Sequence, residues 1–403
     1  MATGSTINYA GEYKLVECTL FSSTGVRARL DSNVIQINIY ENIFASAVMI
    51  NLTVTDQNNM IMNMPIVGQE FVSFKVTTKG VGSFDFTENV FSVHKISARQ
   101  DISAGSQMYE ISCMSTETLR NNRTRVSKSY SGSNAEIVVS ILRDENLIDT
   151  NKEITIDETS RLRKYIAPNS RPIDFIRTLT RESTSKKYGG SPHYFFFENT
   201  KGFQFRVLDS LYKEPFQGEF VASEASMLIE GENKRGDLER DYRRILNFTI
   251  SNSNDTLTSS RRGMLSSNTI KYNIFHKNYT KHTFNYFDNF KDYGRIDENP
   301  IYNQTTIDEK GNTLGDFSNA KIQLHPTSND GTNETSHYDT DSGYVFSDNN
   351  AENWLSTRRS KMTELMMGGI SMQLKTYGYC KLAAGDKVHL TLPITGKDHG
   401  KSK

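Results

Sequence analysis

The histidines and cysteines of this chain lie too far apart in the sequence to form a recognisable metal site. Zinc sites need ligands at short, characteristic spacings, with cysteine or carboxylate support. The nearest histidines, His276 and His282, flank an expected hairpin turn, and we interpret them as solvated turn residues. We predict no metal site and no cofactor. The residues considered are His94, His193, His276, His282, His325, His337, His389, His399, Cys18, Cys113 and Cys380.

Two loops resemble ligand-binding motifs but lack residues that those motifs require. A run of alternating acidic residues begins at Asp339, yet its glycine falls one position early for a calcium loop and no glutamate stands at the twelfth position. Gly231 and Gly236 have the spacing of phosphate-loop glycines, but Asp237 and Leu238 replace the required Lys and Ser/Thr. The sequence therefore supports neither a calcium site nor a nucleotide site.

No constellation of nucleophile, acid and base is recognisable. The Gly-x-Ser-x-Gly elbow of esterases is absent from the sequence. Carboxylates are abundant, but a glycosidase's pair follows no spacing rule along the chain, so abundance identifies no pair. We predict that the protein is not an enzyme and has no catalytic residues. A carbohydrate-acting protein stays open as an alternative.

Composition and charge favour β-structure in a reducing compartment. Hydrophobic residues make up 36% of the 403 residues, and 22 Phe and 19 Tyr accompany a single Trp. Aromatic residues and Thr fit a pleated, half-buried surface, whereas disorder needs few aromatics and a high net charge. The 47 basic and 47 acidic residues cancel, which disfavours nucleic-acid binding through bulk charge. An odd number of widely spaced cysteines argues against a disulfide framework.

Targeting signals and local basic clusters add little to this picture. The start of the chain is polar and predicts no signal peptide, and no run approaches the roughly 18 apolar residues of a membrane span. We interpret the basic clusters as solvated or salt-bridged; contact with an acidic partner, or the lining of a nucleic-acid conduit, is the alternative. The clusters are Arg120, Arg123 and Arg125; Arg161, Arg163 and Lys164; Arg243 and Arg244; Arg261 and Arg262.

Period-two alternation of apolar and polar residues dominates the first 115 residues and is the strongest structural signal. In a strand this pattern places one face in a core and the other in water. Its repetition at short spacing indicates a small barrel or sandwich. Cys18 and Cys113 fall within the alternating runs, where we expect small buried hydrophobes. The apolar positions include Ile35, Ile37, Ile39, Val48, Ile50, Leu52, Val54, Val72, Phe74, Val76, Phe84, Phe86, Phe91, Val93, Tyr109 and Ile111.

The middle of the chain predicts a compact α+β insert. Ser133 and Asn134 resemble a helix cap ahead of an apolar helical face, and Pro172 suits the first turn of a second helix. A short strand is expected at 154–156. Residues 194–197 and 203–207 predict a hairpin, with Gly202 supplying its turn.

The second half alternates between strands and polar segments. We interpret 213–244 as a linker or peripheral turn and 293–350 as a long decorated loop, in which 321–324 looks strand-like. Strand patterning resumes at Leu246, Phe248 and Ile250 and again at 270–274 and 284–286. A helix is expected over 350–367, ended by two glycines and followed by strands at 370–374 and 388–392.

These segments predict a division of the chain into five parts. They are 1–115, a first tube-like β-barrel; 116–212, an α+β insert; 213–350, a second set of strands with long polar loops; 351–393, a helix and strand–turn–strand completing a barrel; and 394–403, a polar tail.

The order of elements resembles the central baseplate hub proteins of contractile, T-even-like phage tails. The residues that carry the resemblance are Lys14 to Val54, Glu136 to Leu208, and Ile370 to Pro393, which reads ISMQLKTYGYCKLAAGDKVHLTLP. In that family the last segment is a strand, a Gly-Asp turn and a strand that completes a barrel. Spike–hub proteins of type VI secretion and other contractile injection systems are relatives.

The resemblance implies an α+β, mainly β fold with two tail-tube-like barrels in each chain. Three chains would then present six barrels, so that a homotrimer adapts the hexameric tail tube to the trimeric central spike. The implied partners are the spike, the tube protein and baseplate wedge proteins, with transient passage of DNA and a tape-measure protein and no stable membrane insertion. The implied location is the tail baseplate of the virion, after assembly in the host cytoplasm. A tail-associated carbohydrate-binding or wall-hydrolysing β-protein is the alternative from another class.

Overall fold

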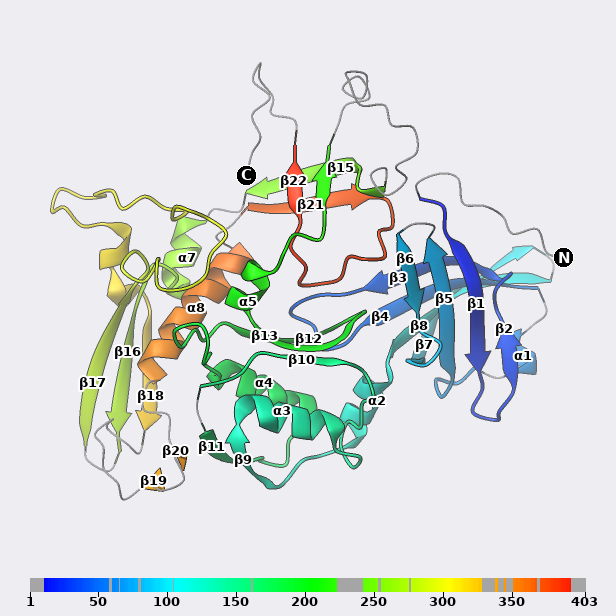
Figure 1. Cartoon of the computed structure of the whole chain (residues 1–403), viewed down its shortest axis with the longest axis horizontal. Helices are drawn as coiled ribbons and strands as arrows, with labels where there is room; N and C mark the ends of the chain where they lie inside the picture. The colour runs from blue at the N-terminus through cyan, green and yellow to red at the C-terminus, as the bar shows by residue number, and fades with distance from the viewer. Residues whose placement is uncertain are drawn as a thin grey trace, which may run out of the picture.

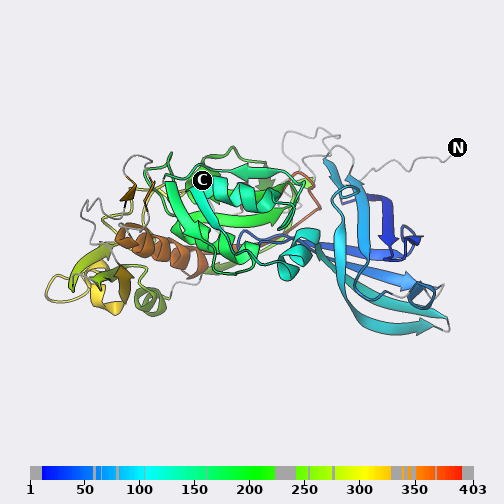
Figure 2. The same ribbon diagram turned by 90° about the horizontal axis from the view of Figure 1, so that it is seen from below.

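The computed structural model describes residues 11–57, 60–64, 66–78, 81–103, 105–160, 162–222, 242–252, 255–274, 277–327, 338–339, 344–345, 351–367 and 370–392. Strands dominate these residues, so the predicted α+β, mainly β fold class is confirmed. Figure 1 shows an elongated molecule, with the N-terminal sheet in blue and cyan at one end and the yellow-green strands with an orange helix at the other. Figure 2, seen from below, shows the same sequence of units. Among the described helices, none is long and apolar enough to span a membrane.

The first sheet curls around a core built from the alternating residues. Its path is β2-β1-β5-β7-β8-β4-β3, with β6 on β5. The end strands β2 and β3 follow each other in the chain and are joined by a turn, in which the amides of Asn33 and Val34 donate to the Leu30 carbonyl. The elements are β1 (Lys14–Phe21), β2 (Arg27–Arg29), β3 (Val34–Tyr40), β4 (Met49–Asp56), α1 (Met60–Asn63), β5 (Phe71–Thr78), β6 (Gly82–Asp85), β7 (Phe91–Ser103) and β8 (Ser106–Ser115).

The predicted core of this sheet is largely confirmed. Cys18 and Cys113 are fully buried free thiols, and burial raises the pKa of each to about 12. Ile35 departs from the pattern because it lies at a register shift in β3 and is exposed. The buried alternating residues include Cys18, Leu20, Val48, Ile50, Leu52, Val54, Val72, Phe74, Phe91, Val93, Tyr109, Ile111 and Cys113.

The middle unit places two helices against a three-stranded sheet of order β10-β13-β12. Ser133 forms a capping box with Glu136 at the start of α3, and Pro172 occupies the first turn of α4, as the sequence predicts. The aromatic hairpin buries Phe203 and Phe205 against these helices. The elements are α2 (Thr116–Arg123), β9 (Ser129–Ser133), α3 (Asn134–Arg143), β10 (Ile154–Ile156), β11 (Leu162–Ile166), α4 (Pro172–Glu182), β12 (Tyr194–Asn199), β13 (Gly202–Val207) and α5 (Leu208–Lys213).

The segment interpreted as a linker contains a strand, so that interpretation is wrong for its start. Strand β14 (Glu219–Val221) pairs in parallel with β22 (His389–Thr391) from the end of the chain. Phe220 is buried there against Tyr379, which shows why this short strand forms in a polar segment. Next to them, β15 (Ile245–Asn252) and β21 (Ile370–Thr376) form a separate antiparallel ribbon. The C-terminal strands therefore pair with strands from a distant part of the chain.

The last unit packs a sheet of order β17-β16-β18 against the predicted helix. The burial of β16 differs from the expected alternation, because Ser266 to Thr269 are buried without a break and only the end of the strand alternates, with Lys271 buried and Tyr272 exposed. The Thr269 hydroxyl bonds the Ser356 hydroxyl of the helix at 2.7 Å, which shows that the polar face is the packed one. The elements are α7 (Thr256–Arg262), β16 (Ser266–Asn273), β17 (Asn278–Asn285), the 3-10 turns Leu314–Asp316 and Ser318–Ala320, β18 (Ile322–Thr327) and α8 (Ala351–Met367). The short strands β19 (Tyr338–Asp339) and β20 (Tyr344–Val345), in the segment interpreted as a long loop, join β11 and β9 of the middle unit in a sheet of order β19-β20-β11-β9.

Closed barrels are not found among the described strands. The first sheet is curled but open between β2 and β3, and the strands expected to form a second barrel are split between the β14–β22 pair, the β15–β21 ribbon and the β17-β16-β18 sheet. The division of the chain into five domains stays a prediction. The glycines expected after α8 and the polar tail lie outside the described residues.

The hairpin turn at Gly202 generates a test of the middle unit. A methyl group on this residue would lie 2.3 Å from the Glu153 carbonyl oxygen, at a φ of +125°. A left-handed backbone conformation alone costs a residue with a Cβ roughly 1–2 kcal/mol. We expect Gly202→Ala to lower the free energy of unfolding by more than this amount. Gly105→Ala is the matched control, because its φ is +85° and nothing lies within 4 Å. Urea unfolding measures both, and equal losses would show that the close approach is unimportant.

Candidate functional site

A buried ionic cluster joins the first sheet to the middle unit. The Lys152 ammonium lies just before β10 and donates to Ser115 Oγ at 2.8 Å, Glu117 Oε2 at 2.7 Å and Glu198 Oε1 at 2.7 Å. Ser115 ends β8, Glu117 lies in the first turn of α2, and Glu198 lies on β12. Lys152 thus uses all three of its donors on groups from three different elements.

The carboxylates of this cluster also have their remaining oxygens paired. Thr150 donates to Glu117 Oε1 at 2.6 Å, and the Val48 amide donates to Glu198 Oε2 at 3.1 Å. Burial raises the pKa of Glu198 despite Lys152, whereas for Glu117 the ammonium and hydroxyl donors outweigh burial and lower the pKa. Burial opposes the charge on Lys152, but the two carboxylates outweigh it and raise its pKa. Because every charged group of the cluster is paired and its members come from β8, α2, β12 and the residues before β10, the cluster joins the first sheet to the middle unit.

A second buried cluster has the residue types of a hydrolase triad but not its geometry. Ser191 Oγ donates to Asp209 Oδ2 at 2.5 Å and lies 3.1 Å from His193 Nδ1. In a triad the serine meets one imidazole nitrogen and the aspartate the other, whereas here both approach Nδ1. All three side chains are buried, and Asp209 also accepts from the Gly294 amide at 2.5 Å. No spacing rule along the sequence marks this cluster, so it was not predicted. It links the middle unit to the segment that follows β17.

Other candidates from the sequence are dispersed by the fold. Among the described residues there is no group of three His, Cys, Asp or Glu side chains that could hold a metal ion. His282 is exposed on β17. Several other candidates lie outside the described residues: His276, Arg161, Gly231, Gly236 and most of the calcium-like loop that begins at Asp339. Arg120 pairs with Asp149 at 2.6 Å, as expected for a salt-bridged cluster. The basic clusters fall on separate elements, and the lining of a nucleic-acid conduit stays the alternative to the prediction of solvated or salt-bridged residues.

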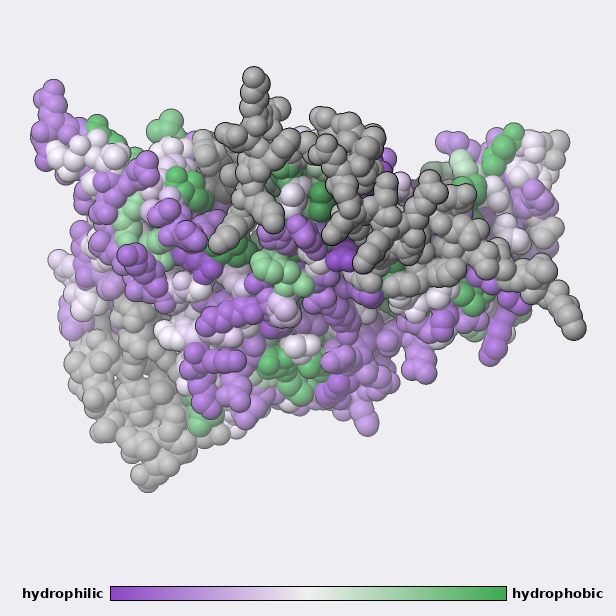
Figure 3. All heavy atoms as spheres, turned by 45° about the horizontal axis from the view of Figure 1, so that its top comes forward, coloured by the Kyte–Doolittle hydropathy of each residue, from purple (hydrophilic) through white to green (hydrophobic). Residues whose placement is uncertain are grey.

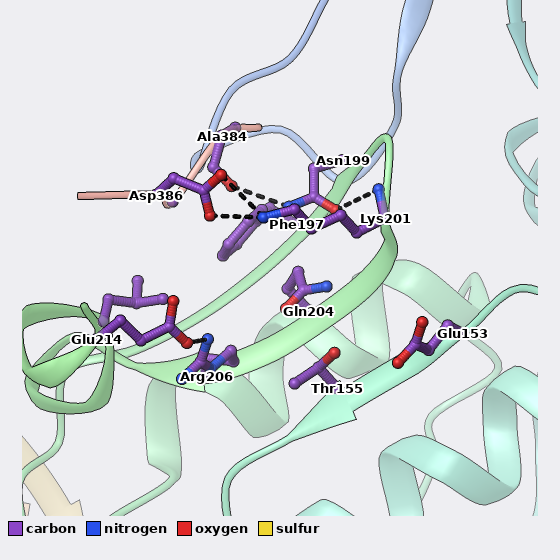
Figure 4. A pocket seen from close by; sticks show the side chains of 12 residues that line it. Glu153, Thr155, Phe197, Asn199, Lys201, Gln204, Arg206, Glu214, Ala384 and Asp386 are labelled. Carbon is purple, nitrogen blue, oxygen red and sulfur yellow. Dashed lines mark hydrogen bonds and ion pairs between the residues drawn. The ribbon is translucent and has the colours of Figure 1, made fainter. Parts of the chain in front are cut away.

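A polar pocket of about 250 Å³ lies between the outer face of the middle sheet and the loop at 383–386. Figure 4 shows Lys201 bridging to Asp386 above, with Gln204 and Thr155 below. Lys201 Nζ lies 2.8 Å from both carboxylate oxygens of Asp386. The predicted Gly-Asp turn is therefore a wall of this pocket. The lining is Glu153, Thr155, Phe197, Asn199, Lys201, Gln204, Arg206, Leu211, Glu214, Ala384, Gly385 and Asp386.

Two apolar surfaces lie outside the cores. On the β15–β21 ribbon, Ile250 and Met372 face each other across the strands and are 47% and 37% exposed. On the sheet of β16 and its neighbours, Leu324 and Tyr279 are 65% and 69% exposed. Figure 3 shows the visible face as mostly hydrophilic, with separate hydrophobic patches. Exposed apolar groups gathered on strands are typical of surfaces that bind protein partners.

Sequence comparisons identify no relative: no family model matches this chain, and no curated protein matches it. Solved structures of similar fold include a tail protein from Neisseria meningitidis, with 9% identity and a TM-score of 0.49 over 94% of this chain and 86% of that one. A prophage tail protein, gp18, from Listeria monocytogenes has 9% identity and a TM-score of 0.40 over 78% and 73%. A 43 kDa tail protein of prophage MuSo2 from Shewanella oneidensis has 10% identity and a TM-score of 0.39 over 67% of each chain. Because the identities are 9–10% and the TM-scores lie below 0.5, these similarities carry no argument about function, and we infer function from the surfaces of this chain.

The ionic cluster predicts a large penalty for removing its cation. Lys152→Met leaves two buried carboxylates without their counter-charge, and we expect a loss of about 3–5 kcal/mol of unfolding free energy. Lys128→Met is the control, because Lys128 is half exposed and pairs with Asp144 at 2.8 Å; its loss should stay at about 1 kcal/mol or less. Chemical denaturation compares the two. Similar losses of unfolding free energy in the two variants would contradict the role of the ionic cluster in holding the first sheet to the middle unit.

The buried imidazole predicts a pH dependence of stability. Burial lowers the pKa of His193 despite Asp209, with Lys361 and Arg358 also opposing protonation, so the ring stays neutral while the unfolded chain takes up a proton. The resulting stabilisation is present above the unfolded pKa of about 6.5 and is lost as the pH falls below it, by at most about 1.4 kcal/mol per pH unit. We expect His193→Gln to flatten the loss of stability between about pH 6.5 and 5. The exposed-site variant His282→Gln should retain the wild-type slope in the same unfolding series, and a slope unchanged in His193→Gln would contradict the assignment.

Proposed function

We propose that this chain is a structural tail protein of a phage or related contractile injection system, and that three copies form the baseplate hub between a hexameric tube and a trimeric spike. The sequence resemblance supports this function, and the β15–β21 ribbon is the structural observation that carries it. Two chain segments more than a hundred residues apart form a ribbon whose apolar face extends beyond its own core.

The apolar face of the ribbon has one residue pair packed on a core and one residue pair exposed to solvent. Phe248 and Leu374 are register partners and pack on the core that contains Phe220 and Tyr379. Ile250 and Met372 are the next partners on the same face, because side chains two residues apart along a strand share a face. This second pair is exposed, so the ribbon presents an apolar surface for which the described part of the chain supplies no cover.

The edges of the ribbon add a second argument for assembly. Among the described residues, the β15–β21 sheet has two strands, and its one further backbone link is the bridge of Arg244 to Val221. An isolated two-stranded ribbon is marginally stable in water, and its unpaired edges can accept a strand from a neighbour. A heterologous contact of this kind closes into a ring when the rotation between copies is one third of a turn.

Within such a ring the partners would be the tube protein on one face, the spike on the other and wedge proteins at the periphery, with DNA and a tape-measure protein passing through the centre. A formal charge of zero suits a conduit that must not bind DNA tightly. The paired state of the buried ionic cluster supports a structural rather than an enzymatic role.

The ribbon predicts that charge on its exposed pair blocks self-association. In sedimentation experiments we expect the wild-type chain to reach three times its monomer mass alone, or to form a complex that contains three copies of the chain when the spike is present. Ile250→Lys and Met372→Lys should weaken this association at least tenfold, because each places an ammonium group in an apolar contact. Ile102→Lys is the control, since Ile102 is exposed on β7 of the first sheet, which is a different sheet from the ribbon.

Electron microscopy and an activity assay complete the test. Negative-stain images of the purified protein should show a three-fold ring with a central hole. A monomer that binds neither spike nor tube under native conditions would overturn the proposal. Turnover of peptidoglycan that a single Asp or Glu substitution abolishes would instead favour the wall-hydrolase alternative.

A further inference from the structure

The floor of the polar pocket carries hydrogen-bonding groups without partners. Gln204 on β13 is 6% exposed, and its amide makes no hydrogen bond to the described residues. Thr155 on β10 is its register partner, and Glu153 lies two residues earlier, so the three side chains share one face of the sheet. The Thr155 hydroxyl and the Glu153 carboxylate are likewise unpaired among the described residues. Because Gln204 lines the pocket, its amide can hydrogen-bond a ligand or water there.

The roof and sides of the pocket are fixed by contacts within the chain. Asn199 Nδ2 donates to the Ala384 carbonyl at 2.9 Å, and the Lys201–Asp386 pair lies beside it, as Figure 4 shows. Arg206 donates to Glu214 and to Ser210 at 3.1 Å. The pocket is therefore preorganised, while its three floor groups stay available.

We propose that this pocket binds a neutral saccharide unit. A sugar ring presents neighbouring hydroxyls that each donate and accept, which suits an amide, a hydroxyl and a carboxylate arranged side by side. A peptide backbone is the poorer fit, because the free groups are side chains on a sheet face rather than the N–H and C=O groups of a strand edge.

Size and charge narrow the ligand further. A volume of about 250 Å³ exceeds by far the ~30 Å³ share of one water molecule and falls just below the ~300–1,000 Å³ of drug-sized sites, so the pocket is of a size for one sugar residue. Lys201 and Arg206 are each paired with a carboxylate, so the unpaired charge in the lining is the Glu153 carboxylate. It favours neutral sugars over acidic ones.

Titration of the full chain with defined sugars tests the inference. The probes are glucose, galactose, N-acetylglucosamine, N-acetylgalactosamine and the N-acetylglucosamine trimer, with glucuronic acid as the acidic arm and trialanine as the peptide arm. By saturation-transfer NMR and calorimetry, we expect at least one neutral sugar to bind more tightly than glucuronic acid and trialanine. Gln204→Leu and Thr155→Val should each weaken that binding about tenfold.

Matched variants make the result independent of folding. Gln100→Leu changes the same residue type at an exposed position on β7 and should leave sugar binding unchanged. Thermal unfolding of each variant must match the wild type before affinities are compared; if Gln204→Leu is unstable, Glu153→Gln replaces it and should also weaken binding. Failure of every neutral sugar to bind, equal affinities of Gln204→Leu and Gln100→Leu, or preferential binding of trialanine would overturn the inference. None of these outcomes bears on ring formation, which the ribbon variants test.

Discussion

The architecture depends on the buried contact of Lys152 with Glu117 and Glu198. One ammonium group draws together the end of β8, the first turn of α2 and the strand β12, and so fixes the first sheet against the middle unit. A buried ion pair adds little net stability, because desolvation offsets the attraction, but it strongly penalises any arrangement that leaves one charge alone. The cluster therefore specifies one orientation of the first sheet relative to the middle unit, whereas a purely apolar interface would allow several. A symmetric assembly needs that rigidity, since small errors in the angle between units would prevent a ring from closing.

Polar groups are packed inside and apolar groups exposed at several points of this chain, and the two facts are connected. Strand β16 turns Thr269 and Lys271 towards α8 and leaves Tyr272 in solvent. The ribbon likewise packs the half-buried Phe248 on a core but exposes Ile250. In a monomer such arrangements waste apolar surface, whereas in an assembly the exposed face becomes a contact. In the proposed assembly these exposed faces would carry the function of the chain.

The polar pocket is the exception to that rule. Its walls are built from β12, β13 and the Gly-Asp turn near the end of the chain, so it exists because the C-terminal segment returns to the middle unit. The same return forms the β14–β22 and β15–β21 pairs. One long-range closure thus creates both the proposed assembly ribbon and the proposed sugar site.

The sequence alone determined the local elements of this protein. Alternation located the buried residues of the first sheet, the cap at Ser133 and the proline at 172 located two helices, and Gly202 located a hairpin, because each signal arises from neighbours in the chain. Tertiary structure alone decided which strands pair. Nothing local shows that Glu219 to Val221 joins the last strand, that β16 buries its polar face, or that Lys152 meets two carboxylates distant in sequence. These features depend on which surfaces approach one another in space. A pattern of period two gives the two faces of a strand, but burial by a partner element decides which face becomes the inside.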